Sequence, residues 1–410
     1  MSEQKNTVAI VCGGGPAPGI NAVIAAVTVE SNRRGWDVLG MYDGFSHLAK
    51  REKVFVRLTY DEVARIHVTG GCILKMARYN PTKKAEDLQA VVETLLELGV
   101  THLVTIAAAV AQYAKEHGRS IRVVHVPKTI DNDLPLPEGV PTFGFETARQ
   151  FGAVEVQNLV EDARTMMNRW YLVIAMGRTA GHLALGIGRS SGAVLTIIPE
   201  EFHKPKIALQ EVVDIIVGSV MKRYRMGRTF GVAVIAEGVL EKIDQADLEK
   251  MGSIELDEHG HVRYSELDFG KILRQALAVE LAKLGHKPNL IDKEIGYELR
   301  CATPIAFDVD YARSLGYEAV RFLHRGKTGA LISIQNELAV PLYFEDIRDS
   351  ETGATKVRRV DVDSAHYRIA RGFMIRLEKS DLEDAALAKD YHLTPEAFQA
   401  RYGYLFAGED

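Results

Sequence analysis

Short apolar runs rich in β-branched residues alternate along the chain with segments whose apolar residues recur at helical spacing. The first run, TVAIVCGG, begins at Thr7, and the helical pattern after it extends from Ile20 to Gly35. The same pairing recurs at the runs DVLGMY, THLVTI, IRVVHV, WYLVIA, GAVLTII and GVAVI. Buried strands that alternate with helices are typical of parallel sheets covered on both faces. The pattern therefore predicts an α/β protein.

The strand–helix pairs suffice for two doubly wound, Rossmann-like units with mostly parallel sheets, followed by a C-terminal extension. We expect the first unit over residues 1–140 and the second over residues 141–330. Residues 331–410 become charged and less strand-like, and we expect them to pack back on the core or to cover an interface. Within them, the stretch 348–364 is typical of an exposed excursion or hairpin.

Composition excludes several classes of protein. A net charge of −5 provides no basic field for nucleic acid. No apolar run approaches the roughly 18 residues that a membrane span needs, and the N-terminus does not resemble a signal peptide. Cys12, Cys72 and Cys301 are odd in number and distant in sequence, so no disulfide framework is expected and a reducing cytoplasm is favoured.

A glycine turn follows the first predicted strand and opens the first predicted helix, at Gly13–Gly15. Such a turn lets backbone N–H groups approach a phosphate, and a helix N-terminus favours an anion. Pro16 and Ala17 break the G-x-G-x-x-G spacing, so the dinucleotide fingerprint is absent. The turn predicts phosphate binding, and a tight turn without a ligand is the alternative.

A second cluster, PKTIDND, follows the run IRVVHV and contains Lys128, Asp131 and Asp133. A carboxylate can take a hydroxyl proton while a lysine neutralises a transferring phosphoryl group. Asp and Asn are also turn formers, so an Asx-turn with a helix cap is the alternative. Weaker signals lie at other predicted strand ends and turns, where the alternative is a solvated side chain: Met176-Gly177-Arg178, Glu237, Tyr297 with Arg300, and Arg78.

Together, the order and strand-end placement of these motifs resemble the phosphofructokinase family, especially its pyrophosphate-dependent branch. The resemblance covers roughly residues 6–330 and rests on GGPAPGIN, PKTIDNDL, MGRTAGHLA, IPEE, AEG and GYELR. Lys128 and Pro16 resemble the residues of pyrophosphate users, so pyrophosphate is favoured over ATP. The resemblance implies transfer of a phosphoryl group to the 1-hydroxyl of fructose 6-phosphate, with Mg²⁺ as cofactor, in a homodimer or homotetramer. It also implies a donor unit over 1–140 and a sugar unit over 141–330.

The resemblance also implies a role for each motif residue. Asp131 would be the general base, with Asp133 orienting the site and Lys128 stabilising the transferring group. The sugar phosphate would be held by Thr129, Ile130, Met176, Gly177, Arg178, Glu237, Tyr297 and Arg300, with Arg169 reaching it from a neighbouring subunit. The donor phosphate would lie on Gly14, Gly15 and Arg78.

The sequence departs from the family where Ala107-Ala108-Ala109 replaces a Gly-Gly-Asp-Asp loop, and the segment after it is short. Met76-Ala77 also replaces two hydroxyl residues before Arg78. Alanine cannot coordinate Mg²⁺, which prefers oxygen ligands. Two alternatives follow: a weak or inactive paralogue that acts as a sugar-phosphate sensor or regulatory subunit, and an ATP-dependent enzyme. A dehydrogenase-like protein would need an acidic residue at the second strand end, whereas Glu30 falls inside the predicted helix.

Overall fold

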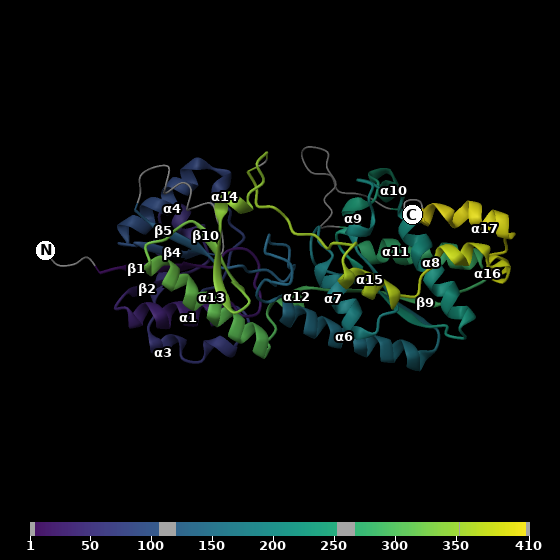
Figure 1. Cartoon of the computed structure of the whole chain (residues 1–410), viewed down its shortest axis with the longest axis horizontal. Coiled ribbons are helices and arrows are strands. Elements are labelled where there is room, and N and C mark those ends of the chain that lie inside the picture. The colour runs from purple at the N-terminus through teal and green to yellow at the C-terminus, as the bar shows by residue number, and fades with distance from the viewer. Residues whose placement is uncertain (1–4, 106–119, 252–266, 352, 407–410) are drawn as a thin grey trace. The chain divides into compact units, whose positions relative to one another are not determined.

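The structure is a computed structural model that describes residues 5–105, 120–251, 267–351 and 353–406. Its internal contacts divide the chain into two units. Unit 1 comprises Met1–Ala148 and Tyr297–Arg358, and unit 2 comprises Arg149–Gly296 and Arg359–Asp410. Each unit contains a sheet whose strand pairs are mostly or entirely parallel, with helices packed on it (Figure 1). The predicted α/β class is therefore confirmed.

The described part of unit 1 contains a sheet of seven strands in the order β11-β10-β5-β4-β1-β2-β3. Its interior pairs are parallel, and the pairs β2–β3 and β10–β11 at the two edges are antiparallel. The strands are β1 (Thr7–Val11), β2 (Asp37–Met41), β3 (Phe55–Arg57), β4 (His102–Thr105), β5 (Arg122–His125), β10 (Ala330–Gln335) and β11 (Leu338–Tyr343). The helices are α1 (Ile20–Arg33), α2 (Ser46–Ala49), α3 (Tyr60–Val63), α4 (Ala85–Glu97), α12 (Tyr297–Arg300), α13 (Ala306–His324) and α14 (Phe344–Ile347).

The two faces of this sheet carry separate apolar cores because successive side chains of a strand point to opposite faces. In β1, Val8 and Ile10 pack with apolar residues of α1 and α13, which lie side by side (Figure 1). Ala9 and Val11 pack on the other face with residues of α2 and α4. Gly316 of α13 allows the close approach of α1, since a Cβ there would lie 2.8 Å from the Val23 carbonyl oxygen. The apolar runs of the sequence thus become strands buried on both faces.

Unit 2 contains an all-parallel sheet of four described strands in the order β7-β8-β6-β9. The strands are β6 (Arg169–Ala175), β7 (Leu195–Ile197), β8 (Gly231–Ala236) and β9 (Asn289–Ile295). The helices are α6 (Phe145–Met166), which begins in unit 1, α7 (His182–Ser191), α8 (Leu209–Arg225), α9 (Val239–Lys242), α10 (Gln245–Met251), α11 (Phe269–Lys283), α15 (Ala365–Gly372), α16 (Ala385–Asp390) and α17 (Pro395–Tyr402). No helix in the described ranges is long and apolar enough to cross a membrane.

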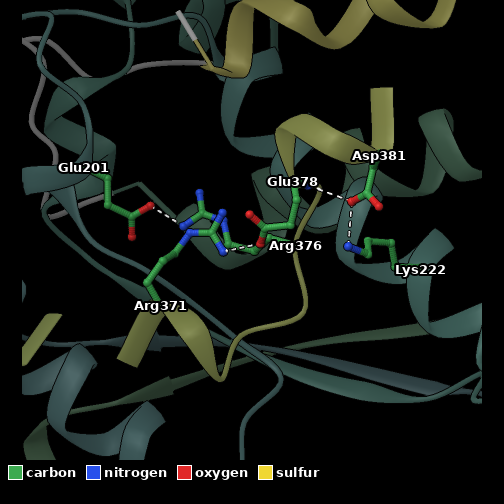
Figure 2. A network of polar contacts seen from close by, with 6 residues as sticks. All are labelled: Glu201, Lys222, Arg371, Arg376, Glu378 and Asp381. Carbon is green, nitrogen blue, oxygen red and sulfur yellow. Dashed lines mark hydrogen bonds and ion pairs between the residues drawn. The ribbon is translucent and has the colours of Figure 1, made fainter. Parts of the chain in front are cut away.

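Within unit 2, the C-terminal stretch that contains Arg376 and Asp381 is joined by ion pairs to earlier parts of the unit (Figure 2). The Arg376 guanidinium donates to Glu201 Oε2 at 2.5 Å, and both side chains are buried, with exposed fractions of 10% and 9%. Lys222 of α8 pairs with Asp381 at 2.6 Å. Although burial disfavours a charged guanidinium, the Glu201 carboxylate holds the pKa of Arg376 above its usual value. The C-terminal residues are therefore anchored to the loop that carries Glu201.

This division differs from the three consecutive segments expected from the sequence. Residues 297–330, expected in the second unit, belong to unit 1, because α13 packs on α1. Residues 331–410 do not form one segment, since those up to Arg358 complete the sheet of unit 1 and the rest join unit 2. The chain therefore crosses between the units three times.

Candidate active site

Two cationic side chains lie close to the backbone of the glycine turn after β1. Gly14 adopts a φ of 81°, and its N–H donates to the Ala77 carbonyl oxygen at 3.3 Å. A Cβ on Gly14 would lie 3.3 Å from Lys128 Nζ, and a Cβ on Gly15 would lie 1.9 Å from Arg300 Nη2. The positive φ favours glycine at position 14, and a side chain at position 15 would displace the Arg300 guanidinium.

Two cations meet at this turn because the topology of unit 1 brings them there. Lys128 follows β5, which is separated from β1 by β4 alone, and parallel strands end at the same edge of a sheet. Its ammonium donates to the Gly15 carbonyl oxygen at 2.6 Å. Arg300 comes from α12, where its guanidinium also lies over the Tyr297 ring at 5.3 Å. The turn therefore combines backbone amides with two positive charges, which suits a phosphate.

The loop after Lys128 carries the two candidate carboxylates. Ile130 and Asp131 are buried, with exposed fractions of 3% and 5%. The Asp131 N–H donates to Thr129 Oγ1 at 3.0 Å, which is the Asx/ST-type turn geometry that the sequence offered as the alternative. Asn132 adopts a left-handed φ of 57°, and its Oδ1 accepts from the Thr142 N–H at 3.0 Å. The turn and the chemical interpretation are therefore compatible, because the turn fixes the backbone of Asp131 and leaves the role of its carboxylate open to chemistry.

Arg358, the last residue of unit 1 along the chain, holds this loop through hydrogen bonds. Its Nε and Nη2 donate to the Asn132 carbonyl oxygen at 3.1 and 3.0 Å, and Nη2 also donates to Asn132 Oδ1. Nη1 donates to the Val140 carbonyl oxygen at 2.8 Å, and the Arg358 N–H donates to the Asp133 carbonyl oxygen at 2.7 Å. Burial lowers the pKa of Arg358 from its usual value. The sequence pattern gave this arginine no role, since it lies in the stretch expected to be an exposed excursion.

The candidate sugar residues of unit 2 meet at the ends of β6 and β8. Glu237 follows β8, and its Oε1 accepts from the N–H groups of Gly177 at 3.0 Å and Arg178 at 2.6 Å. Arg178 has a left-handed φ of 52°, so the turn after Met176 is fixed in an unusual conformation by the carboxylate. The two predicted motifs MGR and AEG are thus joined by direct hydrogen bonds.

Arg169 lies at the opposite end of β6 from Met176. Its Nη1 donates to Asp162 Oδ2 at 2.5 Å, and its Nε is buried without a hydrogen-bond partner. The structure therefore keeps Arg169 apart from the other candidate sugar residues of its own unit.

A cavity of about 570 Å³ in unit 2 borders these turns through Thr179 and Gly238. Glu200 lines it, and its Oε1 accepts from the N–H groups of Gly181 at 2.9 Å and Val360 at 3.0 Å. Burial raises the pKa of Glu200. Glu200 therefore acts as a structural clamp in the described structure, and its place in the IPEE motif is the signal that marked it.

The remaining expectations concern Arg78 and the alanines at 107–109. Arg78 directly follows Ala77, whose carbonyl oxygen accepts from the Gly14 N–H, so the backbone before Arg78 contacts the turn. Ala107–Ala109 lie outside the described residues. In the described ranges, no group of three or more His, Cys, Asp or Glu side chains could hold a metal ion.

Comparisons with known proteins show the family of this chain. The phosphofructokinase family matches residues 7–323. The chain is 48% identical over 408 residues to a pyrophosphate–fructose 6-phosphate 1-phosphotransferase of Thermotoga maritima, covering 96% of this chain and 97% of the relative. It is 47% identical over 418 residues to the protein of the same name from Naegleria fowleri, covering 97% and 95%.

A solved structure shares the fold. The pyrophosphate-dependent phosphofructokinase of Marinobacter aquaeolei superposes with a TM-score of 0.66 at 16% identity, covering 96% of this chain and 91% of that one. The family match spans both units and includes every motif described above. This chain therefore belongs to the phosphofructokinase family.

Proposed function

We propose that this chain transfers a phosphoryl group from pyrophosphate to the 1-hydroxyl of fructose 6-phosphate. The observation that carries the proposal is the Lys128 ammonium, which lies on the Gly15 carbonyl and is followed by the fixed loop of Asp131. The names of the relatives at 48% and 47% identity support the same donor and acceptor. The products are fructose 1,6-bisphosphate and inorganic phosphate.

In the proposed reaction, Asp131, Lys128 and Asp133 have different roles. The Asp131 carboxylate takes the proton of the 1-hydroxyl as the hydroxyl oxygen bonds to the nearer phosphorus atom. The bridging P–O bond of pyrophosphate breaks, and its electrons leave with inorganic phosphate. Lys128 neutralises the charge that develops on the transferring group. Asp133 helps to orient the site.

The binding roles follow the motifs and remain part of the proposal. Gly14, Gly15 and Arg78 would contact the donor phosphate, and Thr129 with Ile130 would contact the sugar. In unit 2, the Glu237 carboxylate would accept a sugar hydroxyl beside Met176, Gly177 and Arg178. The 6-phosphate would be bound by Tyr297 and Arg300, and by Arg169 of a neighbouring copy in a homodimer or homotetramer.

The resemblance implies magnesium as cofactor. The side chains of Ala107–Ala109 carry no oxygen atom, and the described ranges contain no group of three or more His, Cys, Asp or Glu side chains that could hold a metal ion. Magnesium commonly uses one or two carboxylates together with substrate phosphates and water. We therefore assign no protein ligand set to the metal.

The test is a steady-state assay of fructose 6-phosphate with pyrophosphate, with ATP and without a donor, each at several Mg²⁺ concentrations. We expect turnover with pyrophosphate alone among the donors. Asp131→Asn should lower kcat by roughly 10²- to 10⁴-fold because it removes the base. Lys128→Met should lower kcat by about 10²-fold because it removes one stabilising charge.

The exposed residues Glu138 and Lys327 give matched controls. Glu138→Gln and Lys327→Met should leave kcat within about twofold, since neither touches the turn. Turnover with ATP and not with pyrophosphate would contradict the donor assignment.

A second candidate function is a sugar-phosphate sensor or a regulatory subunit, and Ala107–Ala109 is the observation that favours it. Titration calorimetry with fructose 6-phosphate separates the two. If the chain binds fructose 6-phosphate but shows no turnover with any donor, the result would contradict the enzyme and support the sensor.

A further inference from the structure

Asn132 stands between the two candidate carboxylates of the PKTIDND motif, and neither the resemblance nor the proposed reaction gives it a role. Its backbone adopts a left-handed φ of 57°. Glycine reaches that region at no steric cost, and asparagine reaches it more readily than most other residues. If only the backbone conformation mattered, glycine would serve at this position. An asparagine here therefore adds only what its side chain contacts.

The side-chain oxygen of Asn132 is an acceptor shared by donors from two other segments of unit 1. Oδ1 accepts from the Thr142 N–H at 3.0 Å and from Nη2 of Arg358. Both partners can only donate, so the amide oxygen rather than the amide nitrogen must face them. The same guanidinium also donates to the Asn132 backbone carbonyl oxygen, at 3.1 Å from Nε and 3.0 Å from Nη2. One side chain thus joins the loop to two other segments.

Thr142 holds the loop on the other side of Asp131 as well. Its hydroxyl group donates to the Thr129 carbonyl oxygen at 2.7 Å, while its N–H donates to Asn132. Thr142 and the neighbouring Phe143 both have an exposed fraction of 0%. The backbone before and after Asp131 is therefore bound to one buried segment.

We propose that Asn132 is a positioning residue for Asp131: its amide oxygen ties the loop to Thr142 and Arg358 and so holds the base at the sugar hydroxyl group. This inference rests on the proposed function. A general base must lie within about 3 Å of the oxygen atom whose proton it takes, and a displacement near 1 Å costs about 10²-fold in rate. Without the amide oxygen, the buried Thr142 N–H loses its acceptor, which is costly, so the loop shifts.

Asn132→Gly separates the side chain from the backbone conformation. Glycine keeps the left-handed φ and removes the acceptor, so kcat with pyrophosphate should fall by about 10²-fold, with a smaller change in the KM of fructose 6-phosphate. Asn132→Asp keeps an oxygen acceptor in the same place and should recover at least about tenfold of that loss. Steady-state kinetics of the full chain measure both variants, and circular dichroism checks that each is folded.

Asn336 gives the matched control, because it also has a left-handed φ, of 48°, and lies exposed in the turn between β10 and β11. Asn336→Gly should leave kcat within about twofold of that of the unmodified chain, as surface changes usually do. A similar kcat for Asn132→Gly and the unmodified chain would overturn the positioning role. Equal losses for Asn132→Gly and Asn132→Asp would overturn it too, because the acceptor would then be irrelevant.

Hydrogen–deuterium exchange over residues 127–145 tests the same contact without turnover. The Asn132 oxygen protects the Thr142 N–H, so exchange there should be at least about tenfold faster in Asn132→Gly and close to the unmodified rate in Asn132→Asp. Unchanged exchange in Asn132→Gly would contradict the contact. Faster exchange with unchanged kcat would overturn the role in the reaction. An unmodified chain that has the protected N–H but no turnover would instead contradict the proposed function.

Discussion

A single guanidinium, that of Arg358, holds the backbone carbonyl groups of the loop that carries Asp131 and Asp133. The loop contains the strained Asn132, and strained backbone persists only where surrounding contacts fix it. We expect Arg358→Ala to lower kcat by about 10²-fold with a smaller change in KM, because a displacement near 1 Å at a reacting group costs that much. Steady-state kinetics of the variant check this.

Arg358→Lys should recover part of the activity, since an ammonium can still donate to some of the carbonyl groups. Lys356→Ala, an exposed change in the same segment, is the control. A kcat for Arg358→Ala within about twofold of the unmodified chain would show that the loop holds its position without this residue.

The contrast between Lys128 and Arg358 explains how much of the candidate site the sequence predicts. Lys128, the glycine turn and the PKTIDND loop lie at strand ends, where topology collects functional groups, so their meeting can be expected from the pattern. Arg358 bonds mainly to backbone carbonyl groups, which every residue type has. The sequence therefore gives no signal of which groups Arg358 contacts, and only the structure shows its role.

At the scale of elements, several ion pairs hold the C-terminal part of unit 2, and they differ in burial: both side chains of Arg376–Glu201 are buried, whereas those of Arg371–Glu378 are more exposed (Figure 2). Arg376→Ala leaves a buried carboxylate without its partner, which costs about 3–5 kcal/mol. Arg371→Ala removes the pair with Glu378, whose side chains are 21% and 49% exposed, and should cost at most about 1 kcal/mol. Urea unfolding of both variants measures the difference.

The double variant Arg376→Leu with Glu201→Leu tests the physical reason. Because it removes both charges, it should lose less stability than Arg376→Ala. Equal losses for Arg376→Ala and Arg371→Ala would contradict the distinction between the buried and the exposed pair.

Strands with a continuous apolar run were predicted from the sequence, whereas β9 and the hairpin of β10 and β11 were not. The apolar runs that correspond to β1, β2 and β4–β8 were expected as strands, and the structure has strands there in the described residues. β9 was missed because its residues include Asp292, Lys293 and Glu294, which give no apolar run. The edge hairpin of β10 and β11 was missed as well, and with it the return of the chain to unit 1. Long-range pairing is what the local pattern could not predict.

At the scale of the whole molecule, buried histidines make stability depend on pH. Burial lowers the pKa of His125 from its ordinary value to about 4, and its Nδ1 lies 2.7 Å from the Thr105 carbonyl oxygen. The folded chain therefore binds fewer protons than the unfolded chain between pH 6.5 and 4, so stability falls as pH falls through this window. The loss for this residue reaches up to about 3 kcal/mol at pH 4.

His125→Gln removes the titrating group and keeps an N–H donor. We expect its Tm to fall less than that of the unmodified chain between pH 7 and about pH 4.5, the range over which the histidine would charge. The exposed His203→Gln variant is the control. Parallel Tm profiles for His125→Gln and the unmodified chain would exclude His125 as a source of the pH dependence.

The three crossings of the chain have a consequence for its synthesis on the ribosome. In the finished sheet β5 pairs with β4 on one side and with β10 on the other, and β10 begins at Ala330. All of Arg149–Gly296 must be translated before that strand exists, which takes on the order of ten seconds or more. During this interval β5 has an unpaired edge, and such edges are sites of aggregation. Chaperone demand for the nascent chain should therefore persist until β10 has emerged, long after the glycine turn and Lys128 have been made.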